Sequence, residues 1–373
     1  MRTTEIALIG AGPIGIEMAV ALKSAGIDYL HLEAGNIGST MQWWAPGTVF
    51  FSSSDRIEIA SLPLQNEHQG KTSREEYLSY LRTVVLHYKL EIETFTRVTE
   101  ISRQTDGSFI LQCRRSNHGV GGPEELTCNH PVEDHKELLH ELLEPIAAKK
   151  LVLAIGDMHL PRMLNIPGEN LPHVSHYLGE PHQFFAKRVF IVGGKNSAIE
   201  AAIRLARTGA HVTLCYRGNE LDSKRIKFWL YPEIMSLIRK QKISFYNNAT
   251  PVHIESSSTT IRQIDPSTKE TADLKIDTDF VLLLTGYTQN PEIYRQLGIS
   301  LSGEGNKPDF NPQTMETNIP GVYVIGTGSA GTQTAGSTEF IETSHVHVER
   351  IMAHLQGKNP PVAKLNPVPE REI

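Results

Sequence analysis

The sequence predicts an α/β protein made of two similar units, and three observations carry this prediction. The chain has 373 residues, which suggests two or three domains at about 150 residues per domain. Residues 6–26 align with residues 189–209 at a constant offset of 183 positions. In both segments a short apolar run, typical of a strand buried on both faces, leads through a glycine turn into an apolar pattern of helical period.

The glycine turn of the first segment predicts a dinucleotide site. It reads Gly10-Ala11-Gly12-Pro13-Ile14-Gly15, and an acidic residue, Glu33, ends the next predicted strand. Gly10 permits the tight turn, Gly12 lets the backbone approach a pyrophosphate, and Gly15 lets helix and strand pack closely. The phosphates then lie at the helix N-terminus. Because Glu33 can accept hydrogen bonds from an unmodified ribose diol, we expect FAD in this site.

The turn of the second segment carries different charges. In Gly193-Gly194-Lys195-Asn196-Ser197 a lysine replaces the middle glycine, and Tyr216-Arg217 stands where the first unit has Glu33. Loss of the carboxylate removes its repulsion of a 2′-phosphate, and a guanidinium beside an aromatic ring can pair with that phosphate and stack on adenine. We therefore expect NADPH in this site. Solvated side chains at Lys195 and Arg217 are the alternative.

Two different nucleotides on one chain predict an enzyme, an NADPH-dependent FAD-containing oxidoreductase. Flavin and NADPH together imply hydride transfer from nicotinamide to isoalloxazine, for which the protein supplies orientation and electrostatics.

Three further elements set the predicted domain limits. Apolar runs at 151–156 and 280–287 reach Gly156 and Gly286, and prolines after the first of them suggest a crossover between domains. A short apolar run then leads into Gly326-Thr327-Gly328, and Thr338 to Gln356 predicts a helix whose N-terminus can face the flavin ring. We expect two Rossmann-like domains: a discontinuous FAD domain at 1–157 and 286–373, and an NADPH domain at 158–285 inserted in it.

Composition narrows the class of partner and the compartment. The net charge of −6 comes without a basic stripe, which argues against nucleic acid and an anionic membrane. No apolar run approaches the roughly 20 residues that span a bilayer, and the first residues lack the regions of a secretory signal. Three cysteines, Cys113, Cys128 and Cys215, form no CxxC pair and no metal quartet. These features favour a cytoplasmic protein that acts on small molecules and holds no metal.

The ordered motifs resemble those of the low-molecular-weight thioredoxin-reductase-like flavoproteins over nearly the whole chain. The match covers the turn at Gly10, the segment Ala154-Ile155-Gly156, the turn at Gly193 and the segment at Gly326. The resemblance implies an NADPH domain within an FAD domain, and a dimer or higher oligomer. One departure is Thr327, because most relatives have an aspartate there that binds the flavin ribitol.

A closer resemblance is to the YpdA-type bacillithiol-disulfide reductases. It rests on five segments: 50–59, 167–177, 193–197, 216–218 and 314–318. That family commonly has a cysteine at the position that Ile14 occupies here. Because isoleucine has no thiol, this chain cannot supply one at that position. Residues 117–144 are an insertion relative to the family, with a helix expected from Val132 to Glu144. Its histidines (His118, His130, His135 and His140) and Cys128 lack the spacing of a zinc site.

The same resemblance sets the expected mechanism apart from that of thioredoxin reductases, which relay electrons through a CxxC pair. The matching segment here is Val174-Ser175-His176-Tyr177, so no redox disulfide can form within it. His176 and Tyr177 are candidate catalytic proton donors to a reduced product, with a structural role as the alternative. Cys215 is expected to be structural because it lies in a predicted buried strand.

A few other residues are expected near the flavin. Trp43 and its neighbour Trp44 are candidates for the flavin pocket, with ordinary core as the alternative. Ser52 can donate a hydrogen bond to flavin or substrate, or form a polar turn. Thr338, Glu339 and Glu342 lie at the start of the last predicted helix.

Three hypotheses for function remain open on the sequence. The first is reduction of a low-molecular-weight thiol disulfide, such as bacillithiol disulfide, by NADPH through FAD. The second is a flavin reductase or monooxygenase-like enzyme that passes electrons to oxygen or to a protein acceptor, which Ile14 favours slightly. The third is a non-catalytic redox sensor in which FAD and NADPH set a conformation.

Overall fold

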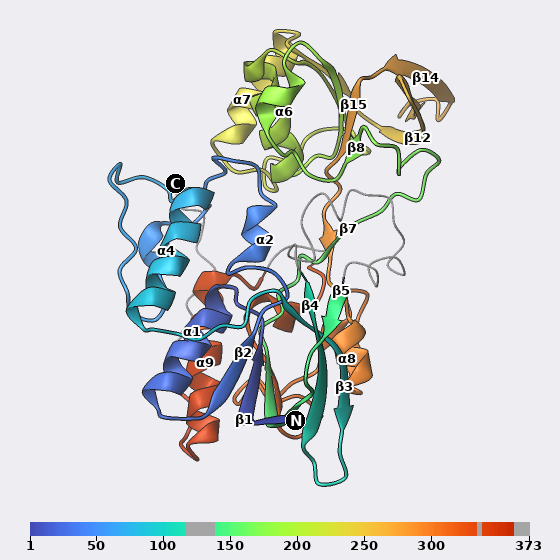
Figure 1. Cartoon of the computed structure of the whole chain (residues 1–373). Helices are drawn as coiled ribbons and strands as arrows, with labels where there is room; N and C mark the ends of the chain where they lie inside the picture. The colour runs from blue at the N-terminus through green and yellow to red at the C-terminus, as the bar shows by residue number, and fades with distance from the viewer. Residues whose placement is uncertain (117–138, 334–337, 362–373) are drawn as a thin grey trace.

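The computed structural model describes residues 1–116, 139–333 and 338–361. Two sheets with helices on their faces form two units, which Figure 1 shows one above the other with the crossover strand β7 between them. We refer to them as the first and second unit. The predicted α/β class with two Rossmann-like units is confirmed.

The first unit is built on a seven-stranded sheet of order β2-β1-β6-β4-β3, in which β19 also pairs with β6 and β5 with β4. Its strands are β1 (Arg2–Ile9), β2 (Tyr29–Leu32), β3 (Thr96–Arg103), β4 (Phe109–Ser116), β5 (Leu139–Leu142), β6 (Ile146–Leu153) and β19 (Val322–Val324). Its helices are α1 (Pro13–Ser24), α2 (Ser39–Gln42), α3 (Ser54–Ile57), α4 (Arg74–His87), α8 (Glu292–Gln296), α9 (Ile341–Leu355) and the 3-10 helix η3 (Gly326–Ala330).

Two cores cover the faces of this sheet. Helices α1, α4 and α9 pack on one face, where Met18, Tyr77 and Ile351 are fully buried (Figure 1). Helix α8 lies on the other face, where Tyr294 packs beside Phe109 and Leu151. The central parallel strand β1 is therefore apolar on both sides, as its unbroken run of buried residues predicts.

The second unit repeats this plan on a five-stranded parallel sheet of order β11-β10-β9-β15-β8. Its strands are β8 (Val174–Ser175), β9 (Arg188–Val192), β10 (His211–Cys215), β11 (Ile243–Tyr246) and β15 (Phe280–Leu283), with η2 (Pro181–Phe184), α6 (Asn196–Thr208) and α7 (Leu230–Arg239) beside them. Val189 pairs with Val212 on one side and with Phe280 on the other. In the first unit, β1 lies in the same way between β2 and β6. The repeat predicted from the sequence is thus a repeat of structure.

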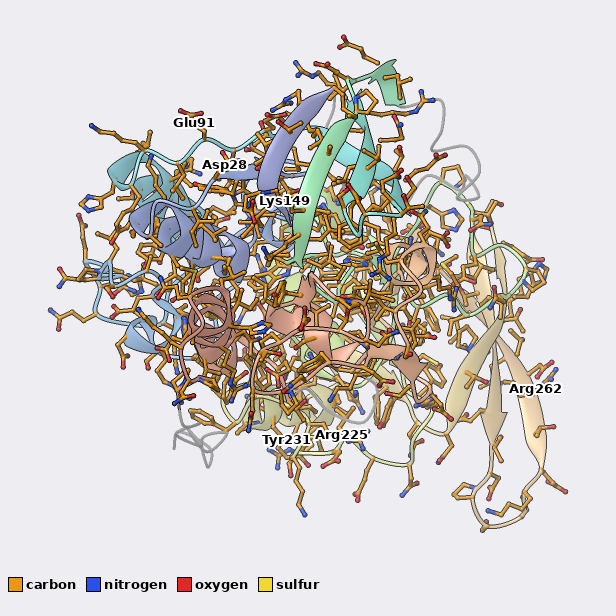
Figure 2. The ribbon with its side chains drawn as sticks, turned by 90° about the horizontal axis from the view of Figure 1, so that it is seen from below. Asp28, Glu91, Lys149, Arg225, Tyr231 and Arg262 are labelled. Atoms are coloured by element: carbon orange, nitrogen blue, oxygen red, sulfur yellow. The ribbon has the colours of Figure 1, made fainter. Side chains whose placement is uncertain are left out.

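Smaller sheets complete the fold. An antiparallel sheet of β12 (Ala249–Glu255), β13 (Ser258–Ile264) and β14 (Thr271–Asp277) extends from the second unit, as the position of Arg262 shows in Figure 2. The chain crosses between units along β7 (Leu160–Pro161) and β16 (Tyr287–Thr288), which pair antiparallel. A last pair joins β17 (Leu301–Ser302) to β18 (Lys307–Pro308).

Two predicted helices differ from the structure. Residues 139–142 of the helix expected at Val132–Glu144 form strand β5, which pairs with β4; residues 132–138 lie outside the described part of the chain. Strand β4 offers residues 139–142 a partner, and Pro145 disfavours helical conformation at Glu144, the residue before it. The last helix begins at Ile341 rather than Thr338, since the Gln333 amide oxygen accepts the N–H groups of Thr338 and Glu339 at 2.6 and 3.1 Å.

Candidate functional site

The first glycine turn has the shape that a pyrophosphate needs. Gly10 has φ +106°, and a Cβ there would lie 2.4 Å from the Ala154 carbonyl oxygen. A Cβ on Gly15 would lie 2.0 Å from the Gly10 carbonyl oxygen, so neither position accepts a side chain. A Cβ on Gly12 would meet no atom within 4 Å, and Pro13 follows it at the start of α1. The free N–H groups at the N-terminus of α1 therefore face open space, where a pyrophosphate can lie.

Glu33 lies beside this turn at the end of β2. Its carboxylate accepts the N–H of Ala11 at 2.6 Å, the N–H of Gly35 at 2.7 Å and the Ser39 hydroxyl at 3.2 Å. Burial raises the pKa of Glu33, although these donors act in the opposite direction. The carboxylate is thus fixed next to the space in front of Gly12, where a ribose diol can donate to its remaining lone pairs. The residues present fit the adenosine half of FAD.

The structure brings the other predicted flavin residues to the same end of the first sheet. A Cβ on Gly326 would lie 3.5 Å from the Ile14 Cβ, and one on Gly156 would lie 3.9 Å from the Thr327 hydroxyl oxygen. Gly326 donates its N–H to His347 Nδ1 at 3.2 Å. Segments more than a hundred residues apart therefore meet at this end of the sheet, in contact with α9.

The remaining residues expected near the flavin lie in different surroundings. Ser52 is buried and donates to the Glu342 carboxylate in the first turn of α9. Trp44 packs in the core of the first unit against Phe50, with ring centroids 5.1 Å apart. Trp43 lies at the boundary of the two units. Thr338 is exposed, and its N–H is bound by Gln333.

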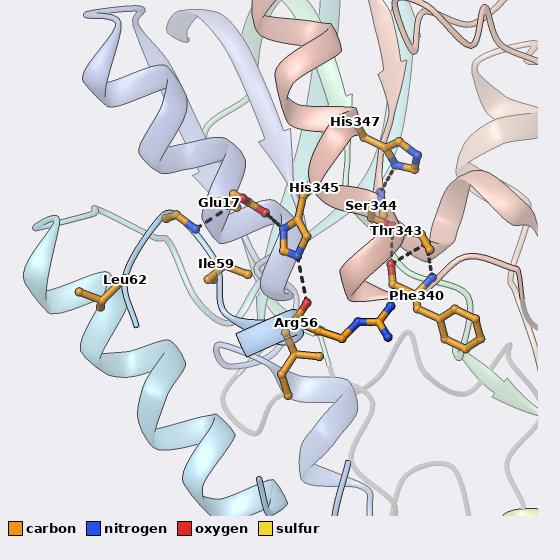
Figure 3. A network of polar contacts seen from close by, with 12 residues as sticks. Glu17, Arg56, Ile59, Leu62, Phe340, Thr343, Ser344, His345 and His347 are labelled. Atoms are coloured by element: carbon orange, nitrogen blue, oxygen red, sulfur yellow. Dashed lines mark hydrogen bonds and ion pairs between the residues drawn. The ribbon is translucent and has the colours of Figure 1, made fainter. Parts of the chain in front are cut away.

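A charged network near the same end of the first sheet was not predicted from the sequence. Glu17 on α1 contacts His345 Nδ1 on α9 at 2.7 Å, and His345 Nε2 lies 3.4 Å from the Arg56 carbonyl oxygen on α3 (Figure 3). Burial alone would lower the pKa of His345, but the hydrogen bond and charge of Glu17 outweigh it and raise that pKa. A cavity of about 360 Å³ adjoins the network. Three distant segments build it, so no local pattern signals it.

The second glycine turn is closed by an aromatic ring. A Cβ on Gly193 would lie 2.6 Å from the Leu284 carbonyl oxygen, and one on Gly194 would lie 2.3 Å from the Tyr216 ring. Helix α6 starts at Asn196, whose side-chain oxygen accepts the N–H of Lys227 at 2.7 Å. Ser197 is exposed in its first turn. The Tyr216 ring thus lies on the turn, where the first unit has a carboxylate.

Four cations converge on this turn. The pKa of Lys195 is lowered by partial burial and by the charges of Arg225, Arg162 and Arg217. Such mutual repulsion is relieved by a polyanion, so the group fits a nucleotide with a pyrophosphate and a 2′-phosphate. Arg162 and Arg225 were not predicted as site residues from the sequence. Arg225 had a weak signal, because it follows Arg217 within the same connection between β10 and α7.

The two catalytic candidates lie just after β8, at the edge of the second sheet. His176 is 4% exposed; its Nδ1 lies 3.3 Å from the Leu283 carbonyl oxygen and its Nε2 3.9 Å from the Glu169 carboxylate. Burial lowers the pKa of His176. These contacts support a structural role, and a catalytic one stays a prediction. Tyr177 instead faces the boundary between the units, where it contacts Trp43 and Tyr287.

The described cysteines have no catalytic surroundings. Cys113 and Cys215 are both buried, and burial raises their pKa to about 11 and about 12. A thiolate is the reactive form, so both are inert at neutral pH. The expectation for Cys215 is confirmed, whereas Cys128 and its neighbouring histidines before position 139 lie outside the described residues. Within the described ranges, no group of three metal-ligating side chains occurs.

Two nucleotide turns of different charge, meeting on one chain, define an oxidoreductase that couples two nucleotides. The model of the pyridine nucleotide-disulphide oxidoreductase family matches residues 7–118 and 133–326, and the chain belongs to that family. It is accordingly an NADPH-dependent enzyme with FAD as its cofactor.

Known proteins that are similar to this chain indicate which kind of reductase it resembles. The chain is 32% identical to bacilliredoxin reductase Bdr of Bacillus subtilis over 93% of this chain and 96% of that protein. The structure of bacillithiol disulfide reductase Bdr (YpdA) from Staphylococcus aureus superposes with a TM-score of 0.80 at 30% identity, covering 96% and 99% of the two chains. Thioredoxin reductase of T. acidophilum, at 19% identity and a TM-score of 0.67, shares the fold and covers 96% and 99%. The resemblance to YpdA-type reductases is confirmed. None of the helices in the described ranges has the length and apolar character of a bilayer-spanning segment.

Proposed function

We propose that the enzyme reduces a low-molecular-weight thiol disulfide of the bacillithiol type with electrons from NADPH. The observation that carries this proposal is the pairing of an unmodified-ribose site at Glu33 with a four-cation phosphate site at Lys195 on a chain related to Bdr along its length. The balanced reaction takes one hydride from NADPH and one proton, and converts one disulfide into two thiols. When bound, FAD supplies the two-electron chemistry that connects the donor to the acceptor.

Specific residues hold the nucleotides in this proposal. Gly10, Gly12, Pro13, Ile14 and Gly15 form the flavin pyrophosphate turn, with Glu33 on the ribose. Gly156, Gly326, Thr327, Ser52, Trp43 and Thr338 are assigned to the flavin end. Residues 193–197 with Tyr216 and Arg217 hold NADPH, and Gly286 ends the neighbouring strand. The proposed domain limits are those predicted above, which the assignment of strands to two sheets supports.

The missing thiol at Ile14 and the absence of CxxC in 174–177 shape the chemistry. With Cys113 and Cys215 inert, no described thiol can form a mixed disulfide with substrate. We propose that the disulfide is reduced at the flavin site directly or with a thiol from outside; Cys128 lies outside the described residues. His176 and Tyr177 stay predicted proton donors, but burial lowers the pKa of His176 and raises that of Tyr177, and neither shift favours donation of a proton near neutral pH. We further propose that the protein is cytoplasmic and homo-oligomeric.

The test is anaerobic NADPH oxidation by the flavin-loaded protein with bacillithiol disulfide, using oxidised glutathione and cystine as controls. We expect stoichiometric turnover with bacillithiol disulfide alone. Flavin that bleaches with NADPH but is reoxidised by none of the three would leave hydride transfer standing and overturn the substrate.

A protein acceptor is the second candidate. The chain is 24% identical to a ferredoxin–NADP reductase of Ignicoccus hospitalis over 86% of this chain and 88% of that protein. Together with Ile14, this relative favours an electron acceptor that needs no protein thiol. Reoxidation of the reduced enzyme by ferredoxin and by none of the disulfides would select it.

A further inference from the structure

Tyr177 carries a buried hydroxyl without a hydrogen-bond partner. The residue is 4% exposed, and its hydroxyl oxygen has no donor or acceptor within the described part of the protein. Such a group costs folding free energy, because it has lost its water and gained no substitute. Burial also raises the pKa of Tyr177 well above its usual range, so the hydroxyl stays protonated and can act as a donor.

Two aromatic rings contact the Tyr177 ring at the boundary of the units. The Tyr287 ring stacks on Tyr177 with centroids 5.7 Å apart and an interplanar angle of 29°. The Trp43 indole meets Tyr177 edge-on at 6.0 Å and 71°. Tyr177 belongs to the second unit and Trp43 to the first, whereas Tyr287 lies in the crossover strand β16 between them. We call these three residues the aromatic junction.

The aromatic junction lies on the side of the second sheet over which the nicotinamide half of the nucleotide is expected to extend. In a doubly wound sheet, a dinucleotide binds across the carboxyl ends of the strands, with its pyrophosphate at the turn after the central strand. That turn follows β9, and Tyr216 and Arg217 place adenosine over β10 on one side. The other half of the dinucleotide must then extend over β15 and β8, and Tyr287 and Tyr177 follow these two strands.

We propose that the Tyr177 hydroxyl binds the nicotinamide half of NADPH by donating a hydrogen bond to the carboxamide oxygen. The nicotinamide ring takes the place of the Trp43 indole against Tyr177. Because Trp43 lies on the other unit, a change in orientation of the units makes this exchange without unfolding either. The proposal rests on the proposed role of NADPH as electron donor, and it assigns Tyr177 to cofactor binding in place of its predicted part as proton donor.

Calorimetric titration of the oxidised, flavin-loaded enzyme tests the proposal with two ligands. NADP⁺ contains the nicotinamide, whereas adenosine 2′,5′-bisphosphate contains only the adenosine half. For Tyr177→Phe we expect NADP⁺ affinity to fall about 3- to 10-fold, the effect of one neutral hydrogen bond, and adenosine 2′,5′-bisphosphate affinity to stay within about twofold of that measured for the wild-type enzyme, since this ligand does not reach Tyr177. The melting temperature should stay equal or rise, since an unsatisfied group is removed.

Tyr231→Phe is the matched control, because it deletes a tyrosine hydroxyl from α7 of the same unit, away from the junction. It should change neither affinity. Unchanged NADP⁺ affinity in Tyr177→Phe, or equal loss for both ligands, would overturn the role of Tyr177 and leave the proposed function intact. A wild-type enzyme that binds adenosine 2′,5′-bisphosphate and NADP⁺ equally would also overturn it. Failure of the wild-type enzyme to bind NADP⁺ at all would overturn both proposals.

Discussion

At the scale of single residues, the two glycine turns differ by what lies on them. In the first unit a carboxylate receives two backbone N–H groups beside the turn, whereas in the second the Tyr216 ring covers it. The ring is confined, because Cβ atoms on Gly194 and Gly218 would lie 2.3 and 2.6 Å from it. A side chain at position 216 is therefore held close to the glycine turn of the second unit.

Exchange of this residue should change the preference for the nucleotide. In Tyr216→Glu the new carboxylate lies near the 2′-phosphate and repels it, so we expect kcat/KM for NADPH relative to NADH to fall about tenfold, which corresponds to about 1.4 kcal/mol. Steady-state kinetics with both nucleotides measure the ratio. Tyr216→Phe keeps the ring and should leave the ratio within about twofold. An unchanged ratio in Tyr216→Glu would show that Tyr216 and Arg217 do not determine the preference for NADPH over NADH.

At the scale of elements, the Glu17–His345 contact joins helices α1 and α9, and the contact of His345 with the Arg56 carbonyl adds α3 (Figure 3). The three helices also share a core. His345 and Glu17 side chains are 28% and 16% exposed. Because the pKa of His345 is raised in the folded state, its protonation stabilises the fold fully below the unfolded pKa of about 6.5. That contribution is lost as pH rises through the folded pKa.

The loss of this contact should therefore depend on pH. We expect Glu17→Gln to lower the free energy of unfolding by about 1 kcal/mol at pH 6 and by less at pH 9, because the contribution of the His345 proton is lost as pH rises. Urea denaturation at the two pH values measures the difference. Glu91→Gln, an exposed substitution elsewhere in the unit, should show no such pH dependence. A Glu17→Gln effect that is equal or larger at pH 9 would contradict the ion pair.

At the scale of the whole molecule, one segment of the first unit contacts the second unit repeatedly. Arg204 on α6 donates to the Pro46 carbonyl, and Lys227 donates to the Val49 carbonyl at 3.3 Å. The Phe51 and Trp229 rings stack with centroids 5.7 Å apart. Lys227 also binds the nucleotide turn through its backbone N–H and Asn196. The orientation of the units thus depends on residues next to the NADPH site.

Removal of the Lys227 ammonium should loosen the first unit at this place. We expect Lys227→Met to speed hydrogen exchange of the amides of residues 47–51 at least about fivefold, while the strands of the second sheet keep their protection. Exchange measured by mass spectrometry resolves these segments. Lys224→Met, an exposed position in the same connection, serves as control. Equal exchange in wild type and Lys227→Met would show that the contact does not hold the units.

The sequence was sufficient for features that local patterns encode. The glycine turns, their strands and α6 with its cap at Gly209 follow from spacing alone. The junction of Trp43, Tyr177 and Tyr287, and the approach of Arg162 to Lys195, depend on how distant segments pack, so no local pattern could predict them. The helix expected up to Glu144 was wrong over residues 139–142 because β4 offers a partner strand and Pro145 disfavours the helix.

The insertion of one unit within the other has a consequence for synthesis on the ribosome. All five strands of the second sheet lie between residues 174 and 283, whereas β19 at 322–324 and α9 at 341–355 belong to the first unit. Synthesis of the first unit therefore begins before that of the second unit and ends after it. Until those final elements emerge, its nascent chain leaves the end of β6 without the β19 neighbour and the apolar face of α1 uncovered, so chaperone demand during translation concentrates on the first unit.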